Sequence, residues 1–232
     1  MAIFATAVHS IWPELSRKNS PDVADAPARH SALALPHPFI VPGGRFREIY
    51  YWDTYFVLRG LVLCDMFETA RNTVVNFAHV VHQLGFVPNG MRVYYANRSQ
   101  PPLLSAMVRL LHNVSQDDAL LRELAPALAM ERDYWTLPQC KTGAGKGSNR
   151  KLVATACRNN SKSVSIATPH SDVTFARYLA DTELPRPESY AVDVKLADDH
   201  HLPDDQRRRL FQNLATGAET GAYKCDEARC VQ

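Results

Sequence analysis

Apolar residues recur at alternating steps of three and four along residues 67–84, and this repeat constrains the fold of the chain more than any other feature. The apolar positions are Phe67, Ala70, Val74, Phe77, Val81 and Leu84. Such steps keep side chains on one face of an α-helix, whereas a half-buried strand alternates every second residue. Gly85 follows, and glycine readily adopts the left-handed backbone that closes many helices. The pattern predicts an amphipathic helix over residues 67–84 that ends at Gly85.

Similar spacing continues on both sides, so residues 53–138 are predicted to form one helix after another. A helix is expected to begin near Pro101 and Pro102, because proline is tolerated in the first turn. Its inward face is made by Leu104, Met107, Val108 and Leu111. The connections are short, as neighbouring antiparallel helices require.

A further helix is predicted after Ser115. Ser115 and Asp118 have the spacing of a capping box, in which each side chain bonds a backbone N–H at the start of the helix. An apolar face follows at Leu121, Leu124 and Leu128. Pro126 lacks an N–H and its ring clashes with the preceding turn, so we expect it to kink or split this helix.

The composition fits a folded globular protein. The 232 residues are 46% hydrophobic and 22% charged, enough to build a core without disulfide bonds. The formal net charge of +2 does not indicate nucleic acid or an anionic membrane as a partner. No apolar run reaches the roughly 18 residues that a membrane-spanning helix needs, so no transmembrane segment is predicted.

The compartment and the oligomeric state stay open at this stage. The first residues do not form a convincing signal peptide, because a basic start is missing and charged Glu14, Arg17 and Lys18 follow a short apolar run. Secreted and cytoplasmic locations are therefore both left as alternatives. Asn-x-Ser sequons begin at Asn97, Asn113 and Asn159, and they matter only if the chain is secreted.

The cysteines do not indicate a metal site. They stand at positions 64, 140, 157, 225 and 230, with no C-x-x-C pair and no histidine at metal-ligand spacing. The cysteines therefore predict no metal site.

Residues 139–171 differ from the rest of the chain, because they are basic and lack Asp and Glu. The segment GAGKGSNRK within them lacks the order of a phosphate-binding loop, and no strand is predicted before it. No aromatic residue is interleaved to stack on bases, which disfavours a nucleic-acid loop. We interpret residues 139–171 as an exposed loop or insertion.

Three loops rich in polar and aromatic residues, 42–56, 87–102 and 184–193, carry the candidate chemistry. Arginine and carboxylate groups can each make two hydrogen bonds to neighbouring sugar hydroxyls, and aromatic rings cover the apolar face of a sugar. A solvated loop charge is the simpler interpretation of any one of these residues. Three such loops in one helical chain favour a sugar site.

These loops resemble the α,α-trehalase family of glycoside hydrolases. PGGRFREIYYWDTYF, from Pro42 to Phe56, is similar to that family's first signature, and the loops PNG…RVYY…RSQPP and RPESY…D follow in the family's order. LATGAETG, from Leu214 to Gly221, is also similar. The resemblance runs from Ile11 to Gly221 and is interrupted at residues 139–171.

The resemblance implies an all-α fold, an incomplete (α/α)6 toroid of paired helices over residues 1–221, followed by a diverged tail at 222–232. We expect the incomplete toroid to leave part of the apolar face of the 67–84 helix uncovered. Family members hydrolyse α,α-trehalose to two glucose molecules with inversion. The implied sugar contacts are Arg45, Trp52, Asp53, Asn89, Arg98, Ser99, Gln100, Arg186, Pro187, Glu188 and Gly221. The resemblance implies that such contacts need neither a metal nor an organic cofactor.

The same resemblance casts doubt on catalysis by this chain. Inversion needs a protonated carboxyl group and an ionised one about 6.5–9.5 Å apart. Tyr223 stands where the family has its acid, an Asp, and Asp226 lies three residues further on. The family's base, a Glu in a distal part, has no counterpart here.

We therefore expect the chain to be inactive alone. We interpret its nearby carboxylates, Glu48, Asp53, Glu188 and Glu219, as binding or structural groups. The alternative is a non-catalytic protein that binds trehalose or another sugar, or that acts through interactions.

Overall fold

Helices make up most of the structure, a computed structural model that describes residues 2–136, 163–167, 172–180 and 182–221. The succession of helices predicted over residues 53–138 is confirmed as far as residue 136, and residues 137 and 138 lie outside the described ranges. In chain order the elements are α1 (Ala2–His9), α2 (Trp12–Leu15), β1 (Ser16–Arg17), α3 (Pro21–Asp25), η1 (Pro27–Arg29), β2 (Phe39–Ile40), α4 (Tyr51–Leu63), α5 (Phe67–Leu84), η2 (Val93–Tyr95), α6 (Leu104–Ser115), α7 (Asp118–Thr136), β3 (Ser163–Ala167), β4 (Asp172–Ala176), η4 (Pro187–Ser189), α9 (Tyr190–Asp199) and α10 (Asp204–Glu219).

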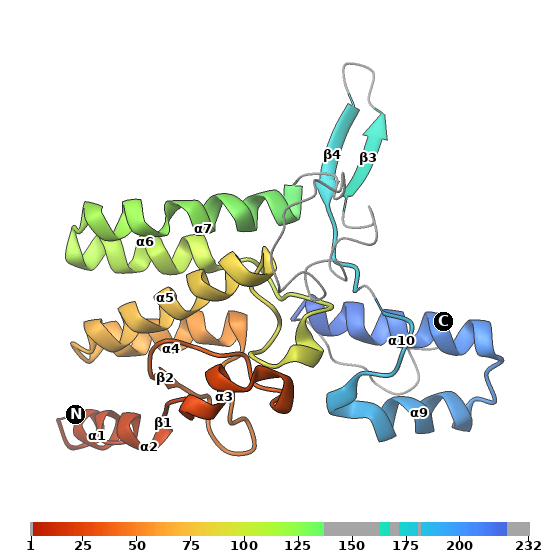
Figure 1. Cartoon of the computed structure of the whole chain (residues 1–232), viewed down its shortest axis with the longest axis horizontal. Coiled ribbons are helices and arrows are strands. Elements are labelled where there is room, and N and C mark those ends of the chain that lie inside the picture. The colour runs from red at the N-terminus through yellow and green to blue at the C-terminus, as the bar shows by residue number, and fades with distance from the viewer. Residues whose placement is uncertain (1, 137–162, 168–171, 181, 222–232) are drawn as a thin grey trace.

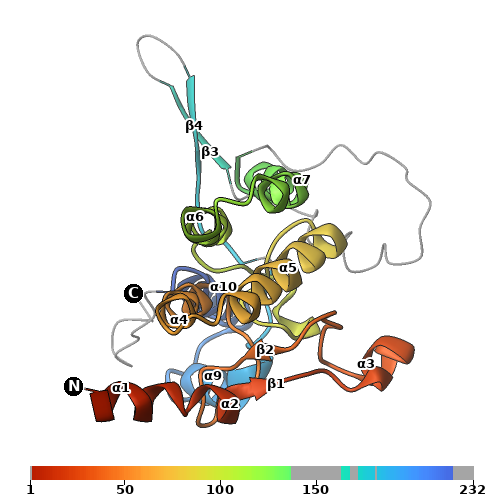
Figure 2. The same cartoon turned by 90° about the vertical axis from the view of Figure 1, so that its left-hand side faces the viewer.

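Helix α5 is the centre of the main hydrophobic core. It contacts α4, α6 and α7, and these four helices lie alongside one another in Figures 1 and 2, with α6 and α7 on one side and α1 to α3 on the other. The predicted bounds of α5 are confirmed, and Gly85 closes it with a φ of 86°. A side chain in that left-handed conformation would be strained, which explains the glycine.

The expectation of an uncovered apolar face on α5 is wrong. Ala70, Val74, Phe77 and Val81 are fully buried, and Leu84 is 5% exposed. Phe67, at the start of the helix, is partly buried against the same core. The face is covered because α4, α6 and α7 all pack against α5, and strand β2 contacts it as well.

The ends of α6 and α7 differ from the sequence predictions. Helix α6 begins at Leu104, after the two prolines, and its predicted inward residues are all buried. The N-terminus of α7 is capped by Asp117, whose Oδ1 accepts hydrogen bonds from the N–H groups of Ala119 at 2.8 Å and Leu120 at 3.2 Å. The predicted Ser115–Asp118 capping box is therefore wrong. Helix α7 also continues through Pro126, so the proline does not split it.

Helices α9 and α10 form a second, smaller group, separated from α4–α7 in Figure 1. They contact each other and bury a small apolar cluster of their own. The buried members of that cluster are Ala197, Leu210, Phe211 and Leu214. The described part of the chain thus holds two apolar cores.

Two short antiparallel sheets accompany the helices. Strand β1 pairs with β2 in the register Ser16↔Ile40, and β3 pairs with β4 in the register Ser163↔Ala176. The β3–β4 hairpin projects beyond α7 in Figure 1. The interpretation of residues 139–171 as loop is wrong for residues 163–167, which form β3. The rest of that stretch lies outside the described residues, and the domain limits at 221 and 222–232 stay predictions.

Within the described ranges, every helix is too short or too polar to span a lipid bilayer. The same ranges contain no group of three or more His, Cys, Asp or Glu side chains placed to hold a metal ion. Cys64 is a free thiol whose Sγ accepts a hydrogen bond from Trp12 Nε1 at 3.3 Å, and the other cysteines lie outside the described residues.

Candidate active site

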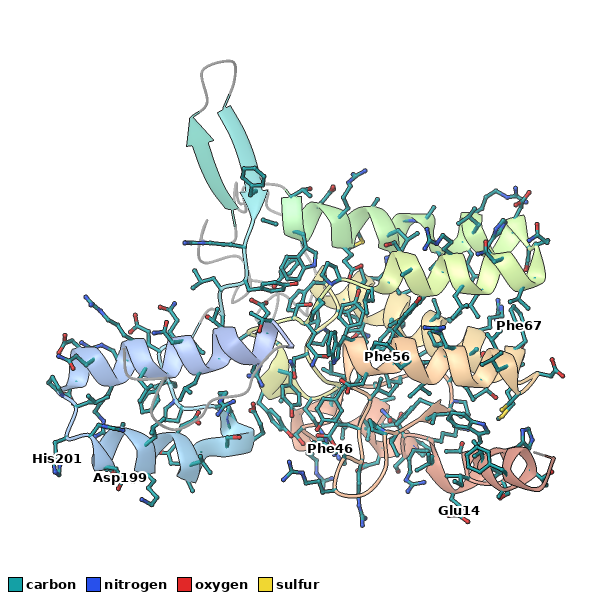
Figure 3. All side chains as sticks on the ribbon, turned by 180° about the vertical axis from the view of Figure 1, so that it is seen from behind. Glu14, Phe46, Phe56, Phe67, Asp199 and His201 are labelled. Atoms are coloured by element: carbon teal, nitrogen blue, oxygen red, sulfur yellow. The ribbon has the colours of Figure 1, made fainter. Side chains whose placement is uncertain are left out.

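A cavity of about 510 Å³ lies where the loops before α4 and after α5 meet the segments at the ends of η4 and α10. Phe46, one of its lining residues, lies between the α9–α10 pair and the main helical group in Figure 3. The lining residues are Pro42, Arg45, Phe46, Glu48, Tyr50, Trp52, Asp53, Asn89, Tyr94, Tyr95, Arg98, Gln100, Arg186, Glu188, Ser189, Ala218 and Gly221.

The loop before α4 supplies one aromatic wall. Gly43 and Gly44 both have positive φ, and the turn that they make pairs Gly43 with Phe46. Arg45 places its guanidinium 4.8 Å from the centre of the Phe46 ring. Trp52 and Asp53 follow in the first turn of α4, so the direction of this helix aims both side chains at the cavity.

The loop after α5 is fixed to α4 by backbone and side-chain hydrogen bonds. The N–H of Tyr51 donates to Asn89 O at 3.1 Å, and the N–H of Trp52 donates to Gln100 Oε1 at 2.9 Å. Gly90 allows the close approach of Tyr95, because a Cβ at position 90 would lie 2.7 Å from the Tyr95 ring. The loop therefore holds Asn89 and Gln100 in defined positions.

Arg98 is the most deeply buried charged group of the cavity wall. It is 1% exposed, forms an ion pair with Glu188, and lies 5.0 Å from the centre of the Tyr95 ring. Its Nε and Nη1 atoms are buried without a hydrogen-bond partner in the described structure. An unmade hydrogen bond on a buried group costs free energy, about 1–3 kcal/mol. A ligand with oxygen acceptors would satisfy these donors.

Arg186 is held by the carboxylate of Asp193, a residue to which the sequence gave no separate role. Asp193 Oδ2 accepts from Arg186 N at 2.9 Å and from Nε at 3.0 Å, and Oδ1 accepts from Nη2 at 2.6 Å. Asp193 is 1% exposed and Arg186 is 7% exposed. This two-pronged pairing fixes the plane of the guanidinium beside the cavity. Asp193 is the last residue of the segment LPRPESYAVD. Its position seven residues after Arg186 is the sequence feature that could have indicated this pairing.

The end of α10 closes the cavity. Gly221 has a φ of 67°, and a Cβ there would lie 3.4 Å from Pro101 and from the Trp52 ring. Asn89 Nδ2 donates to Ala218 O at 3.3 Å. Glu219, between Ala218 and Gly221 in the sequence, is fully buried. It accepts the N–H of Ser99 at 2.8 Å and the N–H of Leu179 at 2.8 Å.

Burial also raises the pKa values of acidic groups in the cavity wall. It raises the pKa of Asp53, and a hydrogen bond within its own residue partly offsets that rise. Burial raises the pKa of Tyr50 to about 12 and that of Tyr95 further. Both phenols therefore stay neutral near pH 7 and can donate as well as accept hydrogen bonds.

The structure brings most of the sequence-predicted site residues together. Those that line the cavity are Arg45, Trp52, Asp53, Asn89, Arg98, Gln100, Arg186, Glu188 and Gly221. Ser99 and Pro187 do not line it. Ser99 is fully buried and its Oγ donates to Val87 O at 2.6 Å, whereas Pro187 is exposed at the start of η4. The role of every one of these residues in sugar binding stays a prediction.

Other lining residues were not singled out from the sequence. They are Pro42, Phe46, Tyr50, Tyr94, Tyr95, Ser189 and Ala218. Most stand inside the three loops named from the sequence. Neighbouring aromatic side chains in these loops point in different directions, so the sequence does not say which of them faces the cavity. Tyr50 lines it, while the adjacent Tyr51 is fully buried in the core. Tyr223, predicted to occupy the position of the acid, lies outside the described residues.

The chain is similar to trehalases in sequence. The family model for trehalase matches residues 1–228. A trehalase from Homo sapiens is 40% identical over 218 residues, which cover 94% of this chain and 33% of that protein. A probable trehalase from Oryza sativa subsp. japonica is 38% identical over 219 residues, which cover 94% of this chain and 35% of that protein. The chain thus spans about a third of the length of these curated relatives.

A solved structure shows the same fold. The neutral trehalase from Saccharomyces cerevisiae superimposes with a TM-score of 0.53 at 24% sequence identity. The match covers 84% of this chain and 35% of the yeast chain. The helices described above therefore correspond to a part of an (α/α)6 toroid, which confirms the predicted fold class.

Proposed function

Because this chain belongs to the trehalase family, we propose that its cavity binds α,α-trehalose as part of the active site of an inverting glycoside hydrolase. The products of that reaction are two glucose molecules. The chain spans about a third of its relatives, so we assign it the sugar-binding contribution described below.

The observation that carries the proposal is the convergence of five side chains from distant segments. Arg45, Asn89, Arg98, Arg186 and Glu188 all line one cavity, and Trp52 lines it with them. Arginine, amide and carboxylate groups are the side chains that bond vicinal hydroxyls. A Trp ring covers the apolar face of a sugar ring.

The buried donors of Arg98 supply the strongest individual argument. Glu188 and the Tyr95 ring hold its guanidinium in place, and none of the described residues supplies an acceptor to Nε or Nη1. A sugar hydroxyl or ring oxygen is a neutral acceptor of suitable size. A site built to hydrogen-bond a ligand in this way discriminates against ligands that leave its buried donors unpaired.

We further propose that this chain does not hydrolyse trehalose alone. Inversion needs one protonated and one ionised carboxyl group on opposite sides of the scissile bond. Of the carboxylates that line the cavity, Glu188 is paired with Arg98 and Glu48 lies 3.7 Å from Arg92. Both carboxylates thus face an arginine, an arrangement that suits sugar binding more than proton donation. Asp53 is the third carboxyl group of the lining, and burial raises its pKa.

Calorimetric titration with trehalose, together with an assay for released glucose, tests both statements. We expect weak saturable binding, at least about tenfold weaker for Arg98→Ala because hydrogen bonds to a charged group are lost. No glucose should form. Absence of saturable binding would contradict the first statement, and glucose release proportional to protein and lost in Arg186→Ala would contradict the second.

A non-catalytic sugar-binding protein is the second candidate. It is favoured by Tyr223, a phenol at the position of the family's acid. A phenol with an ordinary pKa near 10 is a poor proton donor to a glycosidic oxygen. Reading the genomic sequence beyond the Gly221 codon in all three frames separates the candidates. A Gly-Trp-Asp continuation there supports the hydrolase, and its absence supports the binding protein.

A further inference from the structure

The cavity lies at a junction between two separately packed parts of the molecule. One apolar core includes α4–α7, and a second belongs to α9 and α10. The contacts that join these parts beside the cavity include the Arg98–Glu188 ion pair and the hydrogen bond from Asn89 Nδ2 to Ala218 O. Hydrogen bonds and ion pairs are directional, whereas apolar contacts are not. These polar contacts can therefore fix the position of the α9–α10 part relative to the α4–α7 part.

Glu219 occupies the centre of this junction. Its residue is fully buried, and each carboxylate oxygen accepts a backbone N–H from a different segment. Oε1 accepts from Ser99, between Arg98 and Gln100, and Oε2 accepts from Leu179, in the segment after β4. Glu219 itself ends α10, two residues before Gly221. One side chain therefore connects three segments that are far apart in sequence.

The chemistry of this position calls for a carboxylate. The groups of Ser99 and Leu179 that bond to it are both N–H donors, and a carboxylate offers two acceptor oxygens. A glutamine of the same shape offers one acceptor oxygen and one NH₂ group, which would face an N–H donor. The isosteric change Glu219→Gln therefore removes one of the two bonds and leaves a buried donor unpaired, without opening a cavity.

We propose that Glu219 is a positioning residue, which fixes the Arg98–Gln100 loop relative to Gly221 and the end of α10. It does not touch the cavity, so it acts through Arg98, Gln100 and Gly221, which do. The part of this proposal that concerns ligand affinity rests on the proposed function. The part that concerns the two backbone amides does not.

Amide hydrogen exchange measured by NMR on the whole chain tests the proposal. In the wild-type protein the Ser99 and Leu179 amides should exchange slowly, although neither belongs to a helix or strand. In Glu219→Gln at least one of them should exchange about tenfold faster, since hydrogen bonds to charged groups contribute about that factor or more. The amides of Val74 and Phe77, in the core helix α5, should keep their protection.

Trehalose titration of the same variants gives the functional readout. We expect Glu219→Gln to bind trehalose at least about tenfold more weakly, because the loop and α10 are no longer fixed together. The matched control is Glu123→Gln on α7, whose carboxylate lies 3.2 Å from Arg71 at the surface. This control should leave amide exchange and affinity unchanged.

Several results would overturn the proposal. One is rapid exchange of the Ser99 and Leu179 amides in the wild-type protein, a measurement that needs no variant to fold. Another is a uniform loss of protection in Glu219→Gln that includes α5, which would indicate a general contribution to stability and no positioning. If the wild-type chain binds no trehalose, the proposed function fails, and the amide measurement still decides the role of Glu219.

Discussion

The hydroxyl of Tyr51 donates a hydrogen bond to the carboxylate of Glu131, which stands 80 positions further along the chain. The same hydroxyl accepts the N–H groups of Leu103 at 2.9 Å and Leu104 at 2.7 Å. One phenol thus connects the start of α4, the start of α6 and the buried side of α7. Because Trp52 follows Tyr51, this pair also fixes the end of α4 that lines the cavity.

Removing this hydroxyl should destabilise the fold. Tyr51→Phe leaves the buried Glu131 carboxylate and two backbone N–H groups without that partner, so we expect the free energy of unfolding to fall by about 2–4 kcal/mol. Chemical denaturation followed by circular dichroism measures it. Tyr190→Phe, at a residue 60% exposed, is the matched control and should change little. A loss below about 0.5 kcal/mol for Tyr51→Phe, within the range of ordinary surface substitutions, would contradict this account.

Glu131 should make stability depend on pH. Burial raises its pKa from 4.5 to about 7, and the hydrogen bond from Tyr51 offsets part of that rise. A carboxyl group whose pKa is raised by folding stabilises the fold fully below its unfolded pKa of about 4.5. That contribution is lost as the pH rises through about 7, and it amounts to roughly 2–4 kcal/mol.

The difference between wild type and Glu131→Gln isolates this effect from other titrating groups, since burial also raises the pKa of Asp53. We expect the wild-type protein to lose more stability between about pH 5 and pH 8 than the variant does. The measurement is a set of denaturation curves across that range. Parallel curves for the two proteins would show that Glu131 keeps an ordinary pKa.

The Arg186–Asp193 pair should show strong coupling. Breaking a buried ion pair from one side costs about 3–5 kcal/mol, because the other charge is left buried and unpaired. In a double-mutant cycle, Arg186→Ala and Asp193→Asn should therefore each destabilise strongly but add little to each other. The control pair is Lys195–Asp199, which is exposed on α9, the helix that carries Asp193. A coupling of at most about 1 kcal/mol is expected for it. Additive losses at Arg186 and Asp193 would refute the coupling.

Local patterns predicted the helices well because helical contacts are local. The bounds of α5 follow from its three-and-four spacing and from Gly85, and the inward residues of α6 follow in the same way. Caps were harder to predict. Ser115 and Asp118 fit a capping box as well as Asp117 fits a simple cap, and only the observed bonds decide between them.

The loops of the candidate site could be predicted because each is a motif of several residues. The single residues that hold those loops in place could not all be predicted in this way. The loops containing Arg45, Arg98 and Arg186 could be identified from sequence, and the structure brings all three to one cavity. Two partners that hold the site in place, Glu131 and Asp193, were missed. Glu131 is a charged residue on a charged helix, and its burial depends on Tyr51, far away in sequence. No local periodicity encodes that contact.

The central claim is that the buried Arg98 guanidinium binds a sugar, and its own N–H signals test that claim most directly. Arg98 and Arg92 both have a buried Nε without a hydrogen-bond partner in the described structure, but only Arg98 lines the cavity. Arg92 is therefore an internal control in the same loop. The measurement is a proton–nitrogen NMR titration of the arginine Nε–H groups with trehalose.

The account predicts that the Arg98 Nε–H signal shifts saturably as trehalose is added and exchanges more slowly with water, because its donor gains an acceptor. The Arg92 Nε–H signal should stay where it is. An unchanged Arg98 signal at trehalose concentrations that saturate binding, or equal shifts of both signals, would contradict the account.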